Sequence, residues 1–322
     1  MADLLTESMN APAGRLARVL VDLIANDPQV GSMREEIVAR LDRLTSAPTR
    51  VASFAKIRLA ADVSVLHDKL PEWTEAKIVP LFDWKNDGAR DYWSARKFAP
   101  VVGSPQLTAL TKNFLLALFD RPEVPADDKS TYAEWLVLMA MTNADQRKGV
   151  YPIASTEIRS ALRKAGVQAL SGVAHRLATE LGGGTPANQA ARWRDVVGPV
   201  FEAVWPLDVE LTNDMISFKL VQMLVSTGDA IREARDKILP FVRSEARESG
   251  STLFMLADAP DHVFTLAADI VIELTLILLG GEVRVTELQW LRKIQERVQR
   301  LRPEAADTTA FRRLAKLLAI DG

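Results

Sequence analysis

The chain contains no cysteine and only three histidines among its 322 residues. The missing thiols exclude disulfides, thiolate-bound metals and a cysteine nucleophile. The histidines, His67, His175 and His262, are far apart and form no His-x-x-His or His-Glu-x-x-His pattern. We therefore expect no metal site and no cofactor, and we interpret the three as ordinary surface or helix-end residues.

Nucleotide-binding and nucleophile motifs are also missing. The run Gly182-Gly183-Gly184-Thr185 lacks the Lys-Ser/Thr pair and the preceding strand that a phosphate-binding loop needs. A helix end followed by a short connection is the favoured interpretation. No Gly-x-Ser-x-Gly elbow occurs either. We therefore assign no catalytic residue and expect the protein not to be an enzyme.

The charges are nearly balanced, with 40 Lys and Arg against 42 Asp and Glu. No overall field therefore favours nucleic acid or an anionic membrane. The first residues show no basic segment followed by an apolar run, so we expect no signal peptide and a cytoplasmic protein. The segment nearest to a membrane span, Val263 to Leu279, is interrupted by Asp269 and Glu273. We expect it to be a buried core helix.

Hydrophobic residues recur with helical spacing along the whole chain. Leu16, Val19, Leu20, Leu23 and Ile24, for example, define one helical face. No segment shows sustained period-two alternation. The pattern predicts an all-α protein with about fourteen helices, paired in a HEAT-like α-solenoid.

The best linker in the chain is the proline-rich and acidic segment 121–128. It suggests an N-terminal helical lobe over residues 1–122 and a C-terminal helical lobe over residues 123–322, or else one continuous solenoid. Ser104-Pro105 and Thr185-Pro186 predict helix starts, because each joins a capping side chain to proline at the first helical position. Thr131 and Glu134 form a possible capping box.

Residues 192–208 hold two of the seven tryptophans, Trp193 and Trp205. Proline disfavours an unbroken helix, so we expect a break near Gly198-Pro199, a short helix carrying Trp205, and an end at Pro206. The tryptophans could form a ligand-stacking groove, but at helical spacing beside prolines they are better interpreted as core anchors.

Two acidic clusters could carry chemistry. Asp269 and Glu273 are four residues apart on one helical face, and such pairs perform acid–base work, bind metals or pair with arginines of a neighbouring helix. We favour the arginine pairing. His262 follows Asp258 and Asp261, which we interpret as helix-capping acids. A cryptic hydrolase centred on Asp269, Glu273 or His262 is the alternative.

The segment 282–322 is basic, with nine Lys and Arg against six Asp and Glu. The cations are at positions 284, 292, 293, 297, 300, 302, 312, 313 and 316. They could face a phosphate backbone, which would make the chain a nucleic-acid-binding helical scaffold, with Arg292, Lys293, Arg297 and Arg300 as its test positions. Mixed signs at helical spacing are more typical of a solvated surface.

Three short stretches resemble the helical C-terminal region of large bacterial anti-phage defence proteins, of the type found behind sirtuin-like effector domains. The stretches are Asn10 to Leu16, Glu72-Trp73-Thr74 leading to residues 80–84, and Arg192-Trp193 leading to residues 199–201 and 205–208.

The resemblance implies a helical sensing and assembly part that accompanies a separate effector domain. No glycine-rich nucleotide-binding motif precedes Asn10, so NAD hydrolysis does not carry over to this chain. We therefore expect a free-standing subunit or an excised C-terminal half, which binds an effector subunit or a phage protein and can form homo-oligomers. Exposed apolar heptads sufficient for a coiled-coil dimer are not evident.

Overall fold

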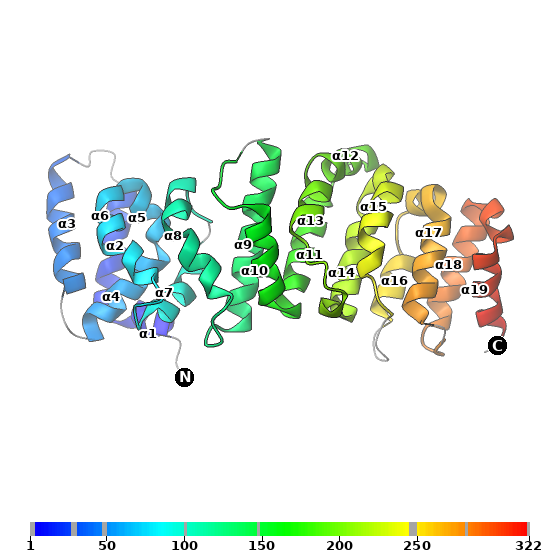
Figure 1. Ribbon diagram of the computed structural model, residues 1–322, viewed down its shortest axis with the longest axis horizontal. Helices are drawn as coiled ribbons and strands as arrows, with labels where there is room; N and C mark the ends of the chain where they lie inside the picture. Colours follow the sequence, from blue (N-terminus) through cyan, green and yellow to red (C-terminus); the bar gives the residue numbers. More distant parts are fainter. Residues whose placement is uncertain are drawn as a thin grey trace. The chain divides into compact units, whose positions relative to one another are not determined.

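The computed structural model describes residues 4–26, 31–46, 50–99, 102–146, 149–244, 250–280 and 283–320. Within these ranges every regular element is a helix and no strand occurs, which confirms the all-α prediction. The helices are labelled α1 to α19 in Figure 1, with short 3-10 and π-helical turns between some of them.

Contacts between residues divide the chain into two compact units. Unit 1 comprises residues 1–135 and 149–154, and unit 2 comprises residues 136–148 and 155–322. The division falls inside α9 (Ala126–Asp145), whereas the sequence suggested a boundary at residues 122 and 123. The division into two lobes that meet at residues 122 and 123 stays a prediction.

Unit 1 contains eight helices and the first half of α9. They are α1 (Leu4–Asn10), α2 (Pro12–Asn26), α3 (Gly31–Ser46), α4 (Arg50–Ala61), α5 (Val63–Lys69), α6 (Pro71–Lys77), α7 (Ala89–Arg96) and α8 (Pro105–Leu118). Helix α4 lies at the centre, in contact with α1, α2, α3, α5 and α7. Edge-on aromatic contacts join Phe82 to Trp93 and Trp93 to Tyr132, with ring centroids 4.9 and 5.1 Å apart.

Unit 2 contains the second half of α9 and ten further helices. They are α10 (Ser155–Ala165), α11 (Val167–Leu181), α12 (Pro186–Arg192), α13 (Gly198–Val204), α14 (Asp214–Val225), α15 (Ile231–Ile238), α16 (Ser251–Ala257), α17 (Asp261–Leu279), α18 (Leu288–Leu301) and α19 (Thr309–Ile320).

The helices of unit 2 contact one another in two successive series. One series runs α11, α14, α16 and α18, and the other runs α10, α13, α15, α17 and α19, with each helix in contact with the next of its series. Contacts between α10 and α11, α14 and α15, α16 and α17, and α18 and α19 join the two series. Each helix therefore packs against near neighbours in the sequence.

The helices are shorter and more numerous than the roughly fourteen expected. The segment expected as one helix from Pro48 towards Leu70 is divided at Asp62 into α4 and α5. The Asp62 carboxylate accepts a hydrogen bond from Arg18 at 3.1 Å and forms an ion pair with Arg58, whose Nε lies 3.0 Å from Oδ2. Both contacts support this turn.

The predicted break at Gly198-Pro199 is a wide turn within a continuing helical path. Trp193–Val197 forms a π-helical turn between α12 and α13, and the Gly198 N–H donates to the Trp193 carbonyl. Because Pro199 has no N–H to donate, a wider turn accommodates it. A Cβ at Gly198 would lie 2.9 Å from the Trp193 carbonyl oxygen. The second helix ends at Val204, so the prediction that it carries Trp205 and ends at Pro206 is wrong. Trp205 follows the helix in an extended backbone conformation.

Two predicted helix starts are confirmed by their capping bonds. Ser104 accepts from the Leu107 N–H at 3.1 Å, and Thr185 accepts from the Asn188 N–H at 3.3 Å. The capping box at Thr131 and Glu134 is wrong, because both residues lie inside α9. The helix already begins after Pro125, where proline ends the preceding segment and acidic residues follow.

Candidate functional site: two concavities of unit 2

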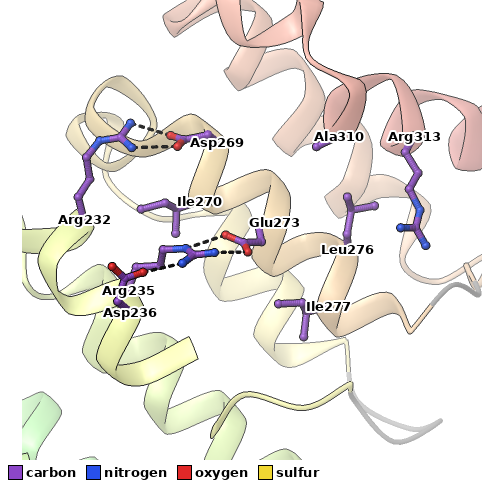
Figure 2. A pocket seen from close by; sticks show the side chains of 10 residues that line it. All are labelled: Arg232, Arg235, Asp236, Asp269, Ile270, Glu273, Leu276, Ile277, Ala310 and Arg313. Atoms are coloured by element: carbon purple, nitrogen blue, oxygen red, sulfur yellow. Dashed lines mark hydrogen bonds and ion pairs between the residues drawn. The ribbon is translucent and has the colours of Figure 1, made fainter. Parts of the chain in front are cut away.

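An open groove of about 720 Å³ lies among α15, α17 and α19 (Figure 2). Its aliphatic wall includes Ile270, Leu276 and Ile277 on α17. Its charged lining consists of three arginines and three acidic residues: Arg232, Arg235, Arg313, Asp236, Asp269 and Glu273. A second open cavity of about 560 Å³ shares Arg235, Asp236 and Ile277 with it.

Two arginines of α15 bind the two carboxylates of α17 in parallel. Arg232 donates to both oxygens of Asp269, at 2.9 and 2.7 Å. Arg235 donates to both oxygens of Glu273, with Nε 2.9 Å from Oε2 (Figure 2). Spacings of three residues on α15 and four on α17 place each pair on facing helix surfaces. The favoured pairing of Asp269 and Glu273 with arginines of a neighbouring helix is confirmed.

Arg232 also bonds to a kink in α17. Ala267 departs from helical geometry, with φ −146° and ψ 41°. The Leu266 carbonyl accepts from Nε and Nη2 of Arg232, at 3.2 and 2.9 Å, and the Thr265 carbonyl accepts from Arg302 at 2.7 Å. A kink leaves carbonyl groups without their intrahelical donors, so these arginines satisfy the groups that it exposes.

The pairing fixes the charge state of the groove. Hydrogen bonding to Glu273, and then to Asp236, raises the pKa of Arg235, and bonding to Asp269 raises the pKa of Arg232. Burial acts to raise the pKa of Asp269, but the hydrogen bond and charge of Arg232 outweigh it and hold that pKa below its usual value. Asp269 is therefore ionised near neutral pH and has no proton to give as a general acid.

By length and composition α17 could cross a membrane, but 61% of its most apolar window is buried inside the structure. It contacts α15, α16, α18 and α19, and both of its central acids are bound to arginines. This arrangement matches the expectation of a core helix.

Separate from the charged groove and its neighbouring cavity is a mainly apolar pocket of about 480 Å³, formed by α12, α14, α16 and the start of α17. Phe218, Val225, Phe254 and Met255 supply its apolar surface, and the amides of Gln189 and Gln222 lie at it. Phe254 is 45% exposed although it is a large aromatic side chain. Few polar groups on an apolar surface are typical of a binding pocket.

Sequence reasoning missed this pocket, although one signal was present. The predicted core positions of α14, Ile216, Leu220, Met223 and Leu224, are all buried. Phe218 lies outside that series, and it faces the pocket. A large aromatic residue out of register with the core face was therefore the available sign.

His262 lines the apolar pocket, whereas Asp269 and Glu273 line the charged groove. The structure therefore does not bring the three residues of the hydrolase alternative together. His262 Nε2 is buried without a hydrogen-bond partner within the described ranges. Among the other histidines, His67 is buried in the last turn of α5, and His175 is exposed on α11.

The capping role expected for Asp258 and Asp261 is wrong. The N-cap residue of α17 is Pro260, and no side chain caps this helix. Asp258 is bound by Lys293, and Asp261 by Arg297. Cations brought by α18 therefore occupy both carboxylates, although Asp261 still lies in the first turn of α17, where negative charge is favourable.

The basic C-terminal residues are largely engaged within unit 2. Besides the two pairs just described, Arg300 pairs with Asp261 and Arg302 with Glu304. The Arg297 guanidinium also lies over the Phe264 ring, 4.0 Å from its centroid. Within the described part of segment 282–322, the cations without an acidic or carbonyl partner are Arg292, Arg313 and Lys316.

Five of the seven tryptophans lie in two kinds of environment. Trp93, Trp193 and Trp205 are buried, as expected for core anchors. The half-buried Trp73 and Trp84 donate their indole N–H groups to the Asp42 carboxylate and the Phe114 carbonyl, at 3.0 and 2.7 Å.

Gly182 ends α11, so the glycine run is the helix end that the sequence predicted. Within the described residues no group of three or more His, Asp or Glu could hold a metal ion.

Comparison with known proteins identifies no family for this chain. No model of a known protein family matches the chain, and no solved structure matches it. The chain is similar to the uncharacterized protein y4cA of Sinorhizobium fredii (strain NBRC 101917 / NGR234), with 27% identity over 110 residues. The matched segment covers 34% of this chain and 9% of that protein.

Proposed function

We propose that the chain is a non-enzymatic helical binding and assembly module of a bacterial anti-phage defence system, and that it acts in the cytoplasm. Its partner is a protein, either an effector subunit or a phage component. The defence context derives from the resemblance of residues 10–16, 72–84 and 192–208. Similarity to a segment of a longer bacterial protein is consistent with a module that accompanies other domains.

We further propose that the helices form a HEAT-like α-solenoid. The two contact series of unit 2 support this arrangement, because a solenoid stacks helix pairs so that each pair contacts only its neighbours. Stacked pairs of this kind form extended surfaces on which a partner can bind.

The half-exposed Phe254 in the apolar pocket is the observation that carries the binding role. Aromatic residues and methionine are enriched where proteins bind one another, and here Met255 lines the same pocket. Phe254 also contacts Trp290 edge-on, with ring centroids 4.8 Å apart, which fixes its ring beside the pocket. An apolar side chain of the partner would fill the pocket and bury this ring.

Such binding changes an effector only if the partner has different affinities for an inhibited and an active state. The charged groove supports a structural role instead of catalysis, since its carboxylates are saturated by arginines. The nucleic-acid alternative is less well supported, because most cations of segment 282–322 are bound to acids or carbonyl groups of unit 2.

The test compares three baits of the full chain, purified from cells before and after phage infection: wild type, Phe254→Asp and Leu207→Asp. Leu207 is 68% exposed and does not line the pocket, so Leu207→Asp is the matched control. We expect a stoichiometric protein captured by wild type and Leu207→Asp but lost with Phe254→Asp. Equal capture by all three baits would reject the pocket as the binding site. Nucleic acid released by salt would favour the alternative function.

The activating role needs a second measurement. The captured protein is added to a reconstituted mixture of this chain and the effector, and effector activity is measured. We expect activity to change with wild type and not with Phe254→Asp. Unchanged activity with wild type would reject sensing and leave binding alone.

A further inference from the structure

Large apolar side chains are exposed mainly near the start of the chain. Among the described residues, fourteen large hydrophobic side chains are exposed, and seven of them lie between Met9 and Val65. Half of these residues thus come from less than a fifth of the sequence. Single exposed apolar residues are ordinary, whereas a concentration of them marks an interaction site.

Three of these residues form a stripe along α2. Leu16, Val19 and Leu23 are 44%, 52% and 42% exposed. Their spacing of three and four residues places them on one side of the helix. We name these three residues the α2 stripe.

Another side of α2 already faces the core of unit 1. Leu20 and Ile24 are buried there, and α2 contacts α1, α3, α4 and α5. The α2 stripe is therefore additional apolar surface that the described part of unit 1 leaves uncovered. Exposed Met9, Met33 and Val51 lie on α1, α3 and α4, the helices that pack against α2.

The two charged residues beside the stripe, Arg15 and Asp22, have opposite signs and follow a defined order along the helix. Arg15 and Asp22 are seven residues apart and lie along the same edge of the stripe, with the cation nearer the helix N-terminus. Arg15 is exposed and has no acidic partner within the described ranges. Asp22 accepts from Arg18 at 2.9 Å, and its side chain is 46% exposed, so it retains room for a second cation.

Two copies of this charge pattern are complementary when the two helices run in opposite directions. When two α2 helices lie antiparallel about a two-fold axis near Val19, Arg15 of each copy faces Asp22 of the other. The two apolar stripes then cover one another, and one sequence supplies two ion pairs across the axis. Such a contact is isologous and closes as a dimer.

We propose that the α2 stripe is a homodimer interface, in which the α2 helices of two copies pack antiparallel. A dimer presents two copies of the C-terminal unit in one particle, and a bound partner that is itself multivalent would gain avidity from this arrangement. The interface lies in unit 1, so its test is independent of the pocket in unit 2.

The first test measures the mass of the full-length protein by sedimentation equilibrium over a range of concentrations. We expect a dimer for wild type and for Leu207→Glu, a control at an exposed position of unit 2. Val19→Glu should weaken dimerisation at least about 100-fold, because each copy then buries a carboxylate without a partner. A monomeric wild type, or a dimer that Val19→Glu leaves intact, would overturn the proposal.

A charge exchange tests the antiparallel geometry. Arg15→Asp and Asp22→Arg each place like charges together twice, so each should weaken dimerisation about 10-fold or more. The double variant R15D/D22R restores both opposite-charge contacts and should recover the wild-type dissociation constant. Failure of the double variant to exceed both single variants would reject the antiparallel pairing.

Two controls separate these effects from altered folding. Asp22→Asn removes the bond to Arg18 without introducing a positive charge, so it should weaken dimerisation less than Asp22→Arg. Equal weakening by both would assign the effect to the lost Arg18 contact and count against the proposal. Far-UV circular dichroism checks that every variant remains helical. If Val19→Glu unfolds, Leu23→Glu takes its place.

Discussion

Replacing Gly228 by alanine should destabilise unit 2 by forcing two pieces of backbone apart. Gly228 begins the 3-10 turn η4 (Gly228–Ala230), with φ +57°. A Cβ at this position would lie 2.1 Å from the carbonyl oxygen of Pro186, the first residue of α12. Because the obstacle is backbone, no side chain can rotate away, and α12 or η4 must move.

The magnitude combines two effects. A left-handed conformation costs an L-residue about 1–2 kcal/mol, and overpacking adds about 1–3 kcal/mol. The expected loss is therefore about 2–5 kcal/mol, a large fraction of the roughly 5–15 kcal/mol that stabilises a typical protein. Gly183→Ala is the matched control, because Gly183 has φ +90° but no atom within 4 Å of its Cβ position.

The assay is urea unfolding followed by far-UV circular dichroism. With a denaturant slope of about 3 kcal/mol/M, Gly228→Ala should lower the midpoint of unit 2 by about 1 M. Gly183→Ala should lower it by less than half as much, since only the backbone conformation is disfavoured. Equal midpoints for the two variants would refute the reasoning, because the contact with Pro186 would then contribute nothing.

Three further outcomes concern polar contacts of unit 2. A double-mutant cycle with Arg235→Ala and Glu273→Ala, measured by urea unfolding, should give a coupling free energy of about 0.5–1 kcal/mol. The value is modest because both side chains are about one-third exposed. A coupling of zero would contradict the observed pair. The folded-state pKa of Asp269 is lowered, so its carboxylate stabilises the protein above the ordinary aspartate pKa and this contribution is lost as pH falls through the folded value. The difference in unfolding free energy between wild type and Asp269→Asn should accordingly shrink on acidification. Urea unfolding at several pH values measures it, and a difference that grows instead would contradict the lowered pKa of Asp269. Thr185→Ala should cost about 1 kcal/mol through loss of the α12 cap, while Thr185→Ser should not.

Local features of the fold could be predicted because their causes are local. Ser104 and Thr185 each cap a helix within three residues, so the sequence alone contains both partners of the bond. The helical faces follow from spacing in the same way. The capping box at Thr131 failed because α9 had already started after Pro125, and its Thr131 side chain bonds to the Asp127 carbonyl instead.

Long-range partners could be predicted only by chemical type. A carboxylate pair in an apolar helix requires cations, so arginines were expected for Asp269 and Glu273, but the sequence does not indicate which helix supplies them. The capping role of Asp258 and Asp261 failed for the same reason. Their carboxylates bind Lys293 and Arg297, more than thirty residues away, and tertiary packing alone decides which acceptor a cation reaches.

The α2 stripe shows what an amphipathic pattern leaves undetermined. Leu16, Val19, Leu20, Leu23 and Ile24 read as one apolar face in the sequence, yet the structure buries Leu20 and Ile24 and exposes the other three. The pattern gives the width of the apolar arc, whereas the positions of neighbouring helices decide how much of that arc they cover. On α2 the apolar arc is wider than the part that neighbouring helices of the described unit cover. Arg15 and Asp22 border the uncovered part, and their order is complementary to that of a second α2 helix running in the opposite direction. We attribute this uncovered part to the dimer contact proposed above, in which the α2 stripes of two copies cover one another.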